Sequence, residues 1–212
     1  VEKPQDGIAT VAERIAKLIN RRNENGQKTV LSLASGRSMR DLFVELVRLH
    51  KEEGLSFKNV IIFGSYEFYP LADKSLGSMA QIQNQLLDHI DILPENVHTF
   101  PGDLPKETIF TFCEEYEKAI EAAGGIDIQV LGIGQCGNIA VNEPGTQPNS
   151  STRLVIMDSN SRMDAKSLFG HATQVPTCAI TLGIDTILQA KEVILLAFGQ
   201  HKASIVKQAI EE

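Results

Sequence analysis

A short polar loop has the composition of a phosphate-binding site. It follows an apolar run at residues 29–33, precedes a helical pattern from about residue 39, and consists of Ser35, Gly36, Arg37 and Ser38. Backbone N–H groups at a helix N-terminus, two hydroxyls and a guanidinium all suit a phosphate monoester. The loop has neither the lysine of a Walker A sequence nor GxGxxG spacing, which disfavours nucleotides. The alternative is an ordinary strand-to-helix turn in which a serine caps the helix.

A lysine late in the chain is a candidate for the same anion. Lys202 follows an apolar run at residues 193–198 and opens the last helical pattern. If the first and last strands lie close, its ammonium group joins the serine-rich loop. The alternative is a surface lysine without a role. Arg153 and Arg162 are similar, since a surface ion pair explains each as well as a ligand contact does.

The stretch at residues 126–144 has the pattern of a buried strand followed by a functional loop. An apolar run breaks on Gly134 and Gly137 and ends in an Asn-Glu-Pro triplet, and open parallel sheets bind ligands at the carboxyl ends of their strands. Cys136 is a nucleophile only if a cation or helix N-terminus stabilises its thiolate, and otherwise a buried, inert cysteine. Glu143 is either a loop carboxylate for chemistry or a cap for backbone N–H groups.

Tyr66 and Glu67 follow another apolar run, at residues 60–63, and are expected where a second strand ends. This is a suitable position for a general acid or base. The alternative is that Tyr66 packs beneath the loop and that Glu67 is solvated.

Hydrophobic periodicity predicts the elements that position these residues. Helices are expected near residues 7–22, 39–51, 77–89, 106–123, 162–168, 184–189 and 199–211, and strands near 29–33, 60–63, 97–100, 126–133, 153–157, 178–182 and 193–198. Apolar strands that alternate with amphipathic helices imply an α/β fold with a mostly parallel sheet covered on both faces.

Composition excludes several classes of protein. With 212 residues, 42% of them hydrophobic, we expect a single domain over residues 1–212. A net charge of −7 argues against a nucleic-acid partner. Three cysteines without a CxxC pair indicate neither disulfides nor a metal site and are typical of a cytoplasmic protein. No apolar run approaches the ~20 residues of a membrane helix. The start has no signal-peptide pattern, and the absent initiator Met suggests a trimmed chain.

Several segments in order resemble the glucosamine-6-phosphate deaminase/isomerase family, whose sheet is shared with 6-phosphogluconolactonases. The resemblance covers nearly the whole chain and is carried by LASGRSM, HKEEGLSFKNVIIFGSYEFYPL, LGIGQCGNIAVNEPG, SSTR, VPTCAITLGIDTIL and FGQHKASIVK. It implies a three-layer α/β/α Rossmann-like fold that binds a phosphorylated sugar across the carboxyl ends of the strands. No cofactor and no metal are expected, and a homo-oligomer stays open because family members are often oligomers.

The resemblance places the phosphate on the loop Ser35–Ser38 and on Lys202. Arg37 stands where a small residue is usual, and Met39 replaces the usual Pro. The family's phosphate-binding arginine matches Ser167, with Lys166 beside it as a substitute.

The implied catalytic positions are altered. Tyr66 stands at the position of the aspartate that moves a proton between C1 and C2, and only Glu67 remains of that Asp-Glu pair. The Asp-Gly-His run that precedes the ring-opening glutamate reads Cys136, Gly137, Asn138, and the glutamate matches Glu143. Tyrosine, with a pKa near ~10, is a poor base at neutral pH, and asparagine transfers no proton.

Three hypotheses follow. The first is a protein of amino-sugar phosphate metabolism that binds a phosphorylated sugar, with deaminase catalysis weak or lost. The second is an active isomerase or lactonase on a different sugar phosphate that uses Glu67 as base, with Glu143 and either Tyr66 or Cys136 in support. The third is a non-catalytic regulatory or structural subunit whose pocket is filled by Arg37, Met39 and Tyr66.

Overall fold

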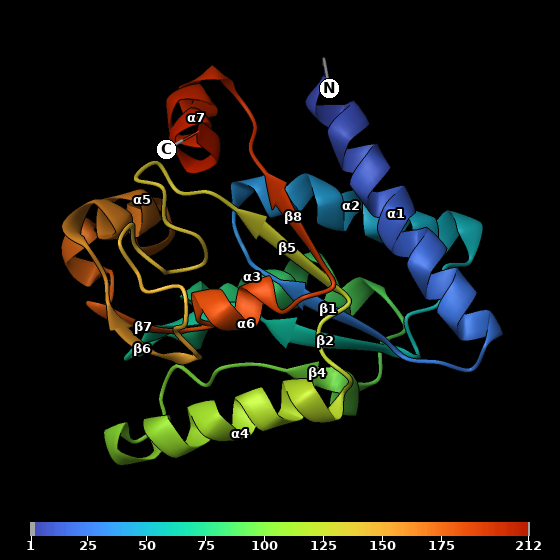
Figure 1. The fold of residues 1–212 in the computed structure, drawn as a ribbon, viewed down its shortest axis with the longest axis horizontal. Helices are drawn as coiled ribbons and strands as arrows, with labels where there is room; N and C mark the ends of the chain where they lie inside the picture. The colour runs from blue at the N-terminus through green and yellow to red at the C-terminus, as the bar shows by residue number, and fades with distance from the viewer. Residues whose placement is uncertain (1–2, 212) are drawn as a thin grey trace.

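A five-stranded parallel sheet forms the centre of the molecule. The computed structural model describes residues 3–211, and the strand order is β4-β2-β1-β5-β8 (Figure 1). The strands are β1 (Thr29–Leu33), β2 (Val60–Gly64), β4 (Val97–His98), β5 (Ile128–Gly132) and β8 (Glu192–Leu196). All four pairings in this sheet are parallel, so the carboxyl ends of the strands share one edge, as open α/β sheets require for a ligand site.

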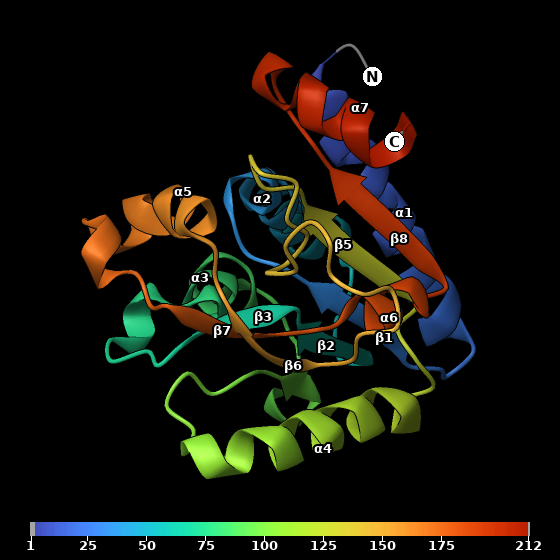
Figure 2. The same cartoon turned by 60° about the vertical axis from the view of Figure 1, so that its left-hand side comes forward.

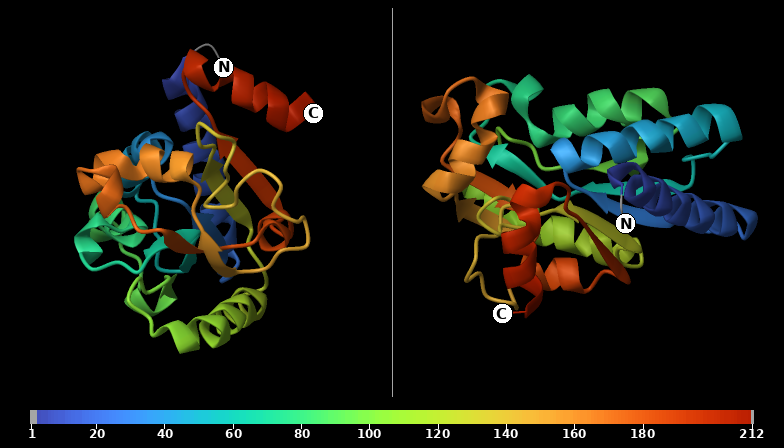
Figure 3. Two further views of the ribbon diagram at one scale, coloured as in Figure 1. Left: turned by 90° about the vertical axis from the view of Figure 1, so that its left-hand side faces the viewer. Right: turned by 90° about the horizontal axis from the view of Figure 1, so that it is seen from above.

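Helices cover both faces of this sheet, as seen from above in Figure 3. One face carries α1 (Pro4–Glu24), α2 (Arg37–Glu53) and α3 (Ser78–Gln85), and the other carries α4 (Ile109–Ala122) and α6 (Ile184–Leu188). Helices α5 (Ser159–Phe169) and α7 (Ala203–Glu211) lie toward the carboxyl ends of the strands. The α/β fold with a mostly parallel, covered sheet is therefore confirmed.

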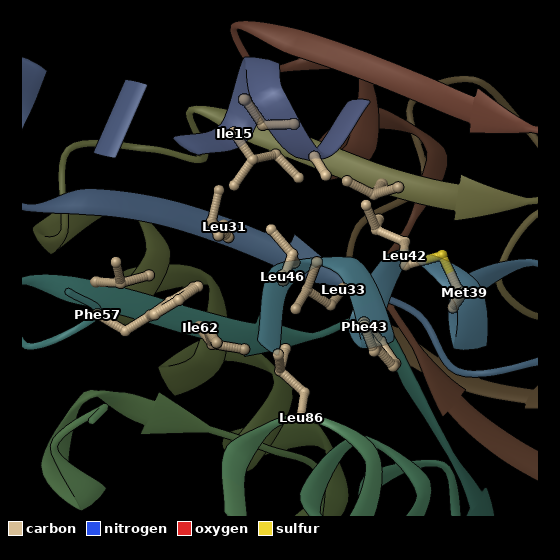
Figure 4. Close-up of a cluster of buried hydrophobic side chains, with 14 of the residues drawn as sticks. Ile15, Leu31, Leu33, Met39, Leu42, Phe43, Leu46, Phe57, Ile62 and Leu86 are labelled. Atoms are coloured by element: carbon tan, nitrogen blue, oxygen red, sulfur yellow. The ribbon is translucent and has the colours of Figure 1, made fainter. Parts of the chain in front are cut away.

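Successive side chains along each strand point to opposite faces of the sheet, so each face has its own hydrophobic core. In β1 and β2, Leu31 and Ile62 join the cluster under α1 and α2 (Figure 4), whereas Val30 and Ile61 join the cluster under α4. Successive strand residues point to opposite faces, so a strand covered on both sides is apolar throughout. This is why the sequence shows unbroken apolar runs at these positions.

A second, three-stranded antiparallel sheet was not predicted. It has the order β3-β7-β6 and contains β3 (Tyr66–Tyr69), β7 (Cys178–Thr181) and β6 (Arg153–Ile156). Figure 2 shows this sheet beside the central one. Ser65 joins the two sheets, because its N–H donates to the Leu33 carbonyl and its own carbonyl accepts from Leu182 N–H. Tyr66 and Glu67 thus lie on a new strand rather than on a loop that ends β2.

Most other differences from the predicted elements concern their ends. The segment at 77–89 is α3 followed by a separate 3-10 turn, η2 (Leu87–His89). Two helices open with 3-10 turns, η4 (Lys106–Thr108) before α4 and η6 (Gln200–Lys202) before α7. The remaining 3-10 turns are η1 (Lys74–Leu76), η3 (Pro94–Asn96) and η5 (Ala172–Gln174). Among the described residues, no helix is long and apolar enough to cross a membrane.

Candidate functional site

A cleft of about 570 Å³ opens at the carboxyl ends of the central strands. Its walls come from the β1–α2 loop, β3, the segment that follows β5, helix α5 and the turn η6. It contains several residues that the sequence singled out: Ser35, Gly36, Arg37, Ser38, Met39, Tyr66, Asn138 and Lys202. The structure therefore brings the serine-rich loop and the late lysine together in one cavity.

The β1–α2 loop presents an uncapped helix N-terminus to this cleft. Helix α2 begins at Arg37, its N-cap is Gly36 with φ of 121°, and no side chain caps it. The alternative of a serine-capped turn is therefore wrong. A left-handed φ of this size favours glycine, and first-turn N–H groups without a cap are free to bind an anion.

Lys202 enters the cleft from η6 although its strand is not a neighbour of β1. Strand β5 separates β1 from β8, and the Lys202 Nζ donates to the Ile133 carbonyl at 2.9 Å. Burial lowers the pKa of Lys202, and the positive charge of Arg37 adds to this effect, whereas Asp164 opposes it. Within residues 3–211 neither Arg37 nor Lys202 has a carboxylate within ion-pair distance. Two cations thus face one end of the cleft.

Tyr66 lies in the cleft with its hydroxyl directed at the serine-rich loop. Its hydroxyl and that of Ser35 share a hydrogen bond of 3.0 Å, and its ring packs edge-on against Phe68. Burial raises the pKa of Tyr66, the bond to Ser35 opposes this, and the charge of Glu67 adds to the increase. Tyr66 therefore stays a neutral phenol at physiological pH.

Glu67 does not line the cleft. Its side chain is buried, and its carboxylate accepts the backbone N–H groups of Phe68, Ser78 and Met79 at 2.8–2.9 Å. Burial raises the pKa of Glu67, and these three donors oppose that effect. A Cβ atom at Gly77 would lie 2.6 Å from its Oε2 atom, so only glycine permits this approach. The expectation that Glu67 could be solvated is wrong, because its place is at the start of α3.

Of the three candidates in the segment after β5, only Asn138 lines the cleft. Its amide packs on Gly134 and donates to the Ala140 carbonyl at 3.3 Å. Glu143 instead accepts the backbone N–H of Asp158 at 3.2 Å, which matches its predicted alternative as a cap.

Cys136 is partly buried outside the cleft lining. Burial raises the pKa of its thiol, and the carboxylates of Asp164, Asp158 and Glu143 raise it further, although Lys202 opposes them. A nucleophilic cysteine needs a lowered pKa. The surroundings of Cys136 therefore favour an inert thiol.

The two arginines that were weighed as ligands have other partners. Arg153 donates to the side chain of Asn142 at 3.0 Å, and Asn142 in turn donates to the Leu182 carbonyl at 2.8 Å. Arg162 donates to the carbonyls of Ala172 and Val175. Both arginines hold loops in place.

Helix α5 supplies cleft residues that the sequence reasoning missed. Ser161, Asp164, Ala165 and Leu168 all line the cleft, together with the expected Ser167, whereas Lys166 does not. Their spacing of three and four residues marks one helix face. This periodicity was the available signal, but the segment is mostly polar, so no apolar face marked it.

The cleft also has an apolar wall. Phe68, Val141 and Met157 are buried in one hydrophobic cluster and also line the cleft, next to the ring of Tyr66. The cavity thus joins two cationic side chains, Arg37 and Lys202, to a partly apolar wall. Such an arrangement suits a small organic phosphate.

Sequence comparison identifies the relatives of this chain. Residues 2–212 match the family described as glucosamine-6-phosphate isomerases/6-phosphogluconolactonase. A putative glucosamine-6-phosphate deaminase-like protein of Bacteroides thetaiotaomicron is 46% identical over 99% of this chain, which spans only 32% of that relative. The glucosamine-6-phosphate deaminase of Porphyromonas gingivalis is 38% identical over 100% of this chain and 81% of its own length.

Solved structures agree with this assignment. A monomeric glucosamine-6-phosphate deaminase superposes with a TM-score of 0.93 and 31% identity, covering 100% of this chain and 86% of its own. A 6-phosphogluconolactonase of Thermotoga maritima shares the fold with a TM-score of 0.72 at 22% identity, over 96% of this chain and 85% of its own. The chain therefore belongs to the family of glucosamine-6-phosphate isomerases and 6-phosphogluconolactonases.

Proposed function

We propose that this protein binds a phosphorylated sugar and that its deaminase catalysis is weak or lost. The observation that carries the proposal is the pair of neighbouring cations, Arg37 and Lys202, that line one cleft together with the serine-rich loop. The uncapped N-terminus of α2 adds backbone donors for the phosphate. The similar proteins are glucosamine-6-phosphate deaminases, which suggests a sugar phosphate as the class of ligand.

Weak catalysis follows from the groups that occupy the reacting positions. Tyr66 has a raised pKa and Asn138 cannot transfer a proton. Glu67 is engaged by three backbone donors. Each acid or base that is lost typically costs about 10²–10⁴ in rate. We infer a sensor, regulator or partner subunit of amino-sugar phosphate metabolism, acting as one domain, since one core cluster contains residues of both sheets.

Titration calorimetry tests the binding proposal. We expect heat of binding for fructose 6-phosphate or glucosamine 6-phosphate at micromolar to millimolar concentration, which Lys202→Ala weakens by about tenfold or more because a charged hydrogen bond is lost. Lys51→Ala, at an exposed lysine near the far end of α2, is the matched control and should leave binding unchanged. Absence of heat for both ligands at millimolar concentration contradicts the proposal.

The two alternatives, an active enzyme on a different sugar phosphate and a subunit with a filled pocket, require different arrangements of the same cleft. An enzyme that uses Glu67 as base needs that carboxylate in the cleft, whereas Glu67 is not among the described residues that line it and its oxygens accept three backbone N–H groups. A subunit with a filled pocket needs Arg37, Met39 and Tyr66 to close the cavity, yet all three line a cleft of about 570 Å³. A coupled assay for ammonia and ketose release, run beside the calorimetry, separates a binder from an active deaminase.

A further inference from the structure

We propose that Tyr66 is a positioning residue for anion binding, and that its hydroxyl directs the hydrogen of the Ser35 hydroxyl toward a phosphate group in the cleft. This inference rests on the proposed function, because it assumes that the phosphate of the ligand occupies the serine-rich loop at the start of α2. It gives Tyr66 a role that neither a general base nor a filler of the pocket has.

The two hydroxyls meet in the wall of the cleft, beside the first turn of α2. Ser35 directly precedes the N-cap Gly36, and both Ser35 and Tyr66 line the cleft. Their hydroxyl oxygens lie 3.0 Å apart, and within residues 3–211 the Ser35 hydroxyl has no second hydrogen-bond partner. An anion bound at this uncapped helix N-terminus therefore lies next to a hydroxyl that Tyr66 already contacts.

The chemistry of an anion decides the direction of this hydrogen bond. A phosphate dianion only accepts hydrogen bonds, so the Ser35 hydroxyl contributes to binding only by donating its single hydrogen. The bond to Tyr66 must then run from the phenol to the Ser35 oxygen. A hydroxyl can accept one hydrogen bond while it donates another, and the bonds of such a chain strengthen one another.

Tyr66 is suited to be the donor in this chain. Burial raises the pKa of Tyr66, so the phenol keeps its hydrogen at physiological pH. The hydroxyl of Ser78 lies close enough to influence this pKa, is fully buried and has no hydrogen-bond partner among the described residues. It is therefore available to donate to the Tyr66 oxygen once the phenol hydrogen points at Ser35.

The surroundings of Tyr66 fix the position of its hydroxyl. Its ring meets Phe68 edge-on with 5.7 Å between the ring centroids, and Phe68 meets Phe169 of α5 in the same way at 5.0 Å. The backbone of Tyr66 pairs with Thr181 of β7. A ring that is already held by its neighbours loses little freedom when an anion binds, so it can orient Ser35 at little entropic cost.

Tyr66→Phe tests this role because it removes the hydroxyl and keeps the ring. We expect the affinities for fructose 6-phosphate and for inorganic phosphate to fall by the same factor, about threefold to tenfold, since the lost hydroxyl acts on the phosphate that both ligands share. Calorimetric titration measures each ligand. Tyr69→Phe is the matched control on the same strand.

The control removes a phenol hydroxyl that has another function. The Tyr69 hydroxyl donates to the Leu104 carbonyl at 2.9 Å, and Tyr69 is not among the described residues that line the cleft. We therefore expect Tyr69→Phe to leave both affinities within about twofold of the unmodified protein.

A double-mutant cycle with Ser35→Ala separates positioning from a general loss of packing. We expect Ser35→Ala to weaken both ligands by about tenfold or more, because a hydrogen bond to a charged group is lost. The double variant should stay within about twofold of Ser35→Ala, since Tyr66 then has no hydroxyl to orient. A packing defect caused by Tyr66→Phe would instead add to the loss. Cooperative thermal unfolding of each variant checks that it folds.

The results separate this inference from the proposed function. Unchanged or tighter binding by Tyr66→Phe overturns the inference, and so do additive losses in the cycle. A loss for fructose 6-phosphate alone also overturns it, because Tyr66 then contacts the sugar. If the unmodified protein binds fructose 6-phosphate no more tightly than inorganic phosphate, the proposed function fails, while the phosphate titrations still test Tyr66. Absence of binding for both ligands contradicts both.

Discussion

The ammonium group of Lys202 lies at the wall of the cleft, where burial lowers its pKa. The ammonium group is therefore lost at a lower pH than that of an ordinary lysine, and anion affinity should fall as the pH rises toward that value. The positive charge of Arg37 lowers the pKa of Lys202 further, and the negative charge of Asp164 raises it. A sugar phosphate is already a dianion above its second pKa of about 6, so its own titration does not mask this decline.

Lys202→Arg tests this residue because a guanidinium keeps its charge throughout the accessible pH range. We expect the affinity for fructose 6-phosphate to fall at least severalfold between pH 7 and pH 10 in the unmodified protein and to stay nearly constant in the variant. Calorimetric titration at four pH values measures both profiles, with Lys51→Arg as the control that follows the unmodified protein. Parallel profiles would show that another group causes the decline.

At the scale of single residues, the sequence predicted the groups that are recognisable from residue type and from their position after a strand. The loop Ser35–Ser38 and Lys202 were found from residue type and from their place at strand ends, and both line the cleft. The direction of Glu67 could not be found in this way. A single step along a strand turns a side chain to the other face, so the unrecognised β3 left the direction of Glu67 undetermined.

At the scale of elements, Glu67 and α3 depend on each other. The carboxylate accepts N–H groups from the first turn of α3, Ser78 and Met79, and from its own neighbour Phe68. In Glu67→Gln one oxygen becomes an NH₂ group that faces N–H donors. We expect a loss of about 2–3 kcal/mol in the free energy of unfolding, because buried donors lose an acceptor and the helix dipole loses its negative charge.

Urea denaturation measures this loss, and Glu95→Gln, at an exposed glutamate, provides the control with a change within about 0.5 kcal/mol. The same variant separates two of the hypotheses for this protein. If Glu67→Gln abolishes turnover of a phosphorylated sugar while the free energy of unfolding stays unchanged, Glu67 is a catalytic base and its capping role is secondary.

Elements with strong periodicity were predictable, and those without it were not. Strands β1, β2 and β5 are buried on both faces and therefore appear as unbroken apolar runs. Strand β3 has four residues, too few to show alternation, and only its pairing with β7 makes it a strand. Helix α5 was expected, but its polar residues concealed the face that lines the cleft.

At the scale of the whole molecule, the candidate site and a buried charge network lie at opposite edges of the central sheet. The cleft lies at the carboxyl ends of the strands, while Asp127 lies just before β5, at the amino ends. Its buried carboxylate contacts Arg22 of α1 at 2.6 Å and Lys191 at 2.7 Å, and it accepts the backbone N–H of Val30 at 2.8 Å. One side chain thus joins α1, β1 and the segments before β5 and β8.

Asp127→Asn should therefore destabilise the fold without changing the cleft. We expect a loss of about 2–4 kcal/mol in the free energy of unfolding, because the partly buried Arg22 loses its counter-ion and a buried charged network is broken. Glu13→Gln, which removes the exposed pair of Glu13 with Lys17, should cost less than about 0.5 kcal/mol. Urea denaturation gives the stabilities, and calorimetry under native conditions gives the affinity for fructose 6-phosphate. Because the rigid parallel sheet separates the two edges, the affinity of Asp127→Asn should stay within about twofold of the unmodified protein. A large change in affinity would instead show that the network at the amino ends controls the shape of the cleft.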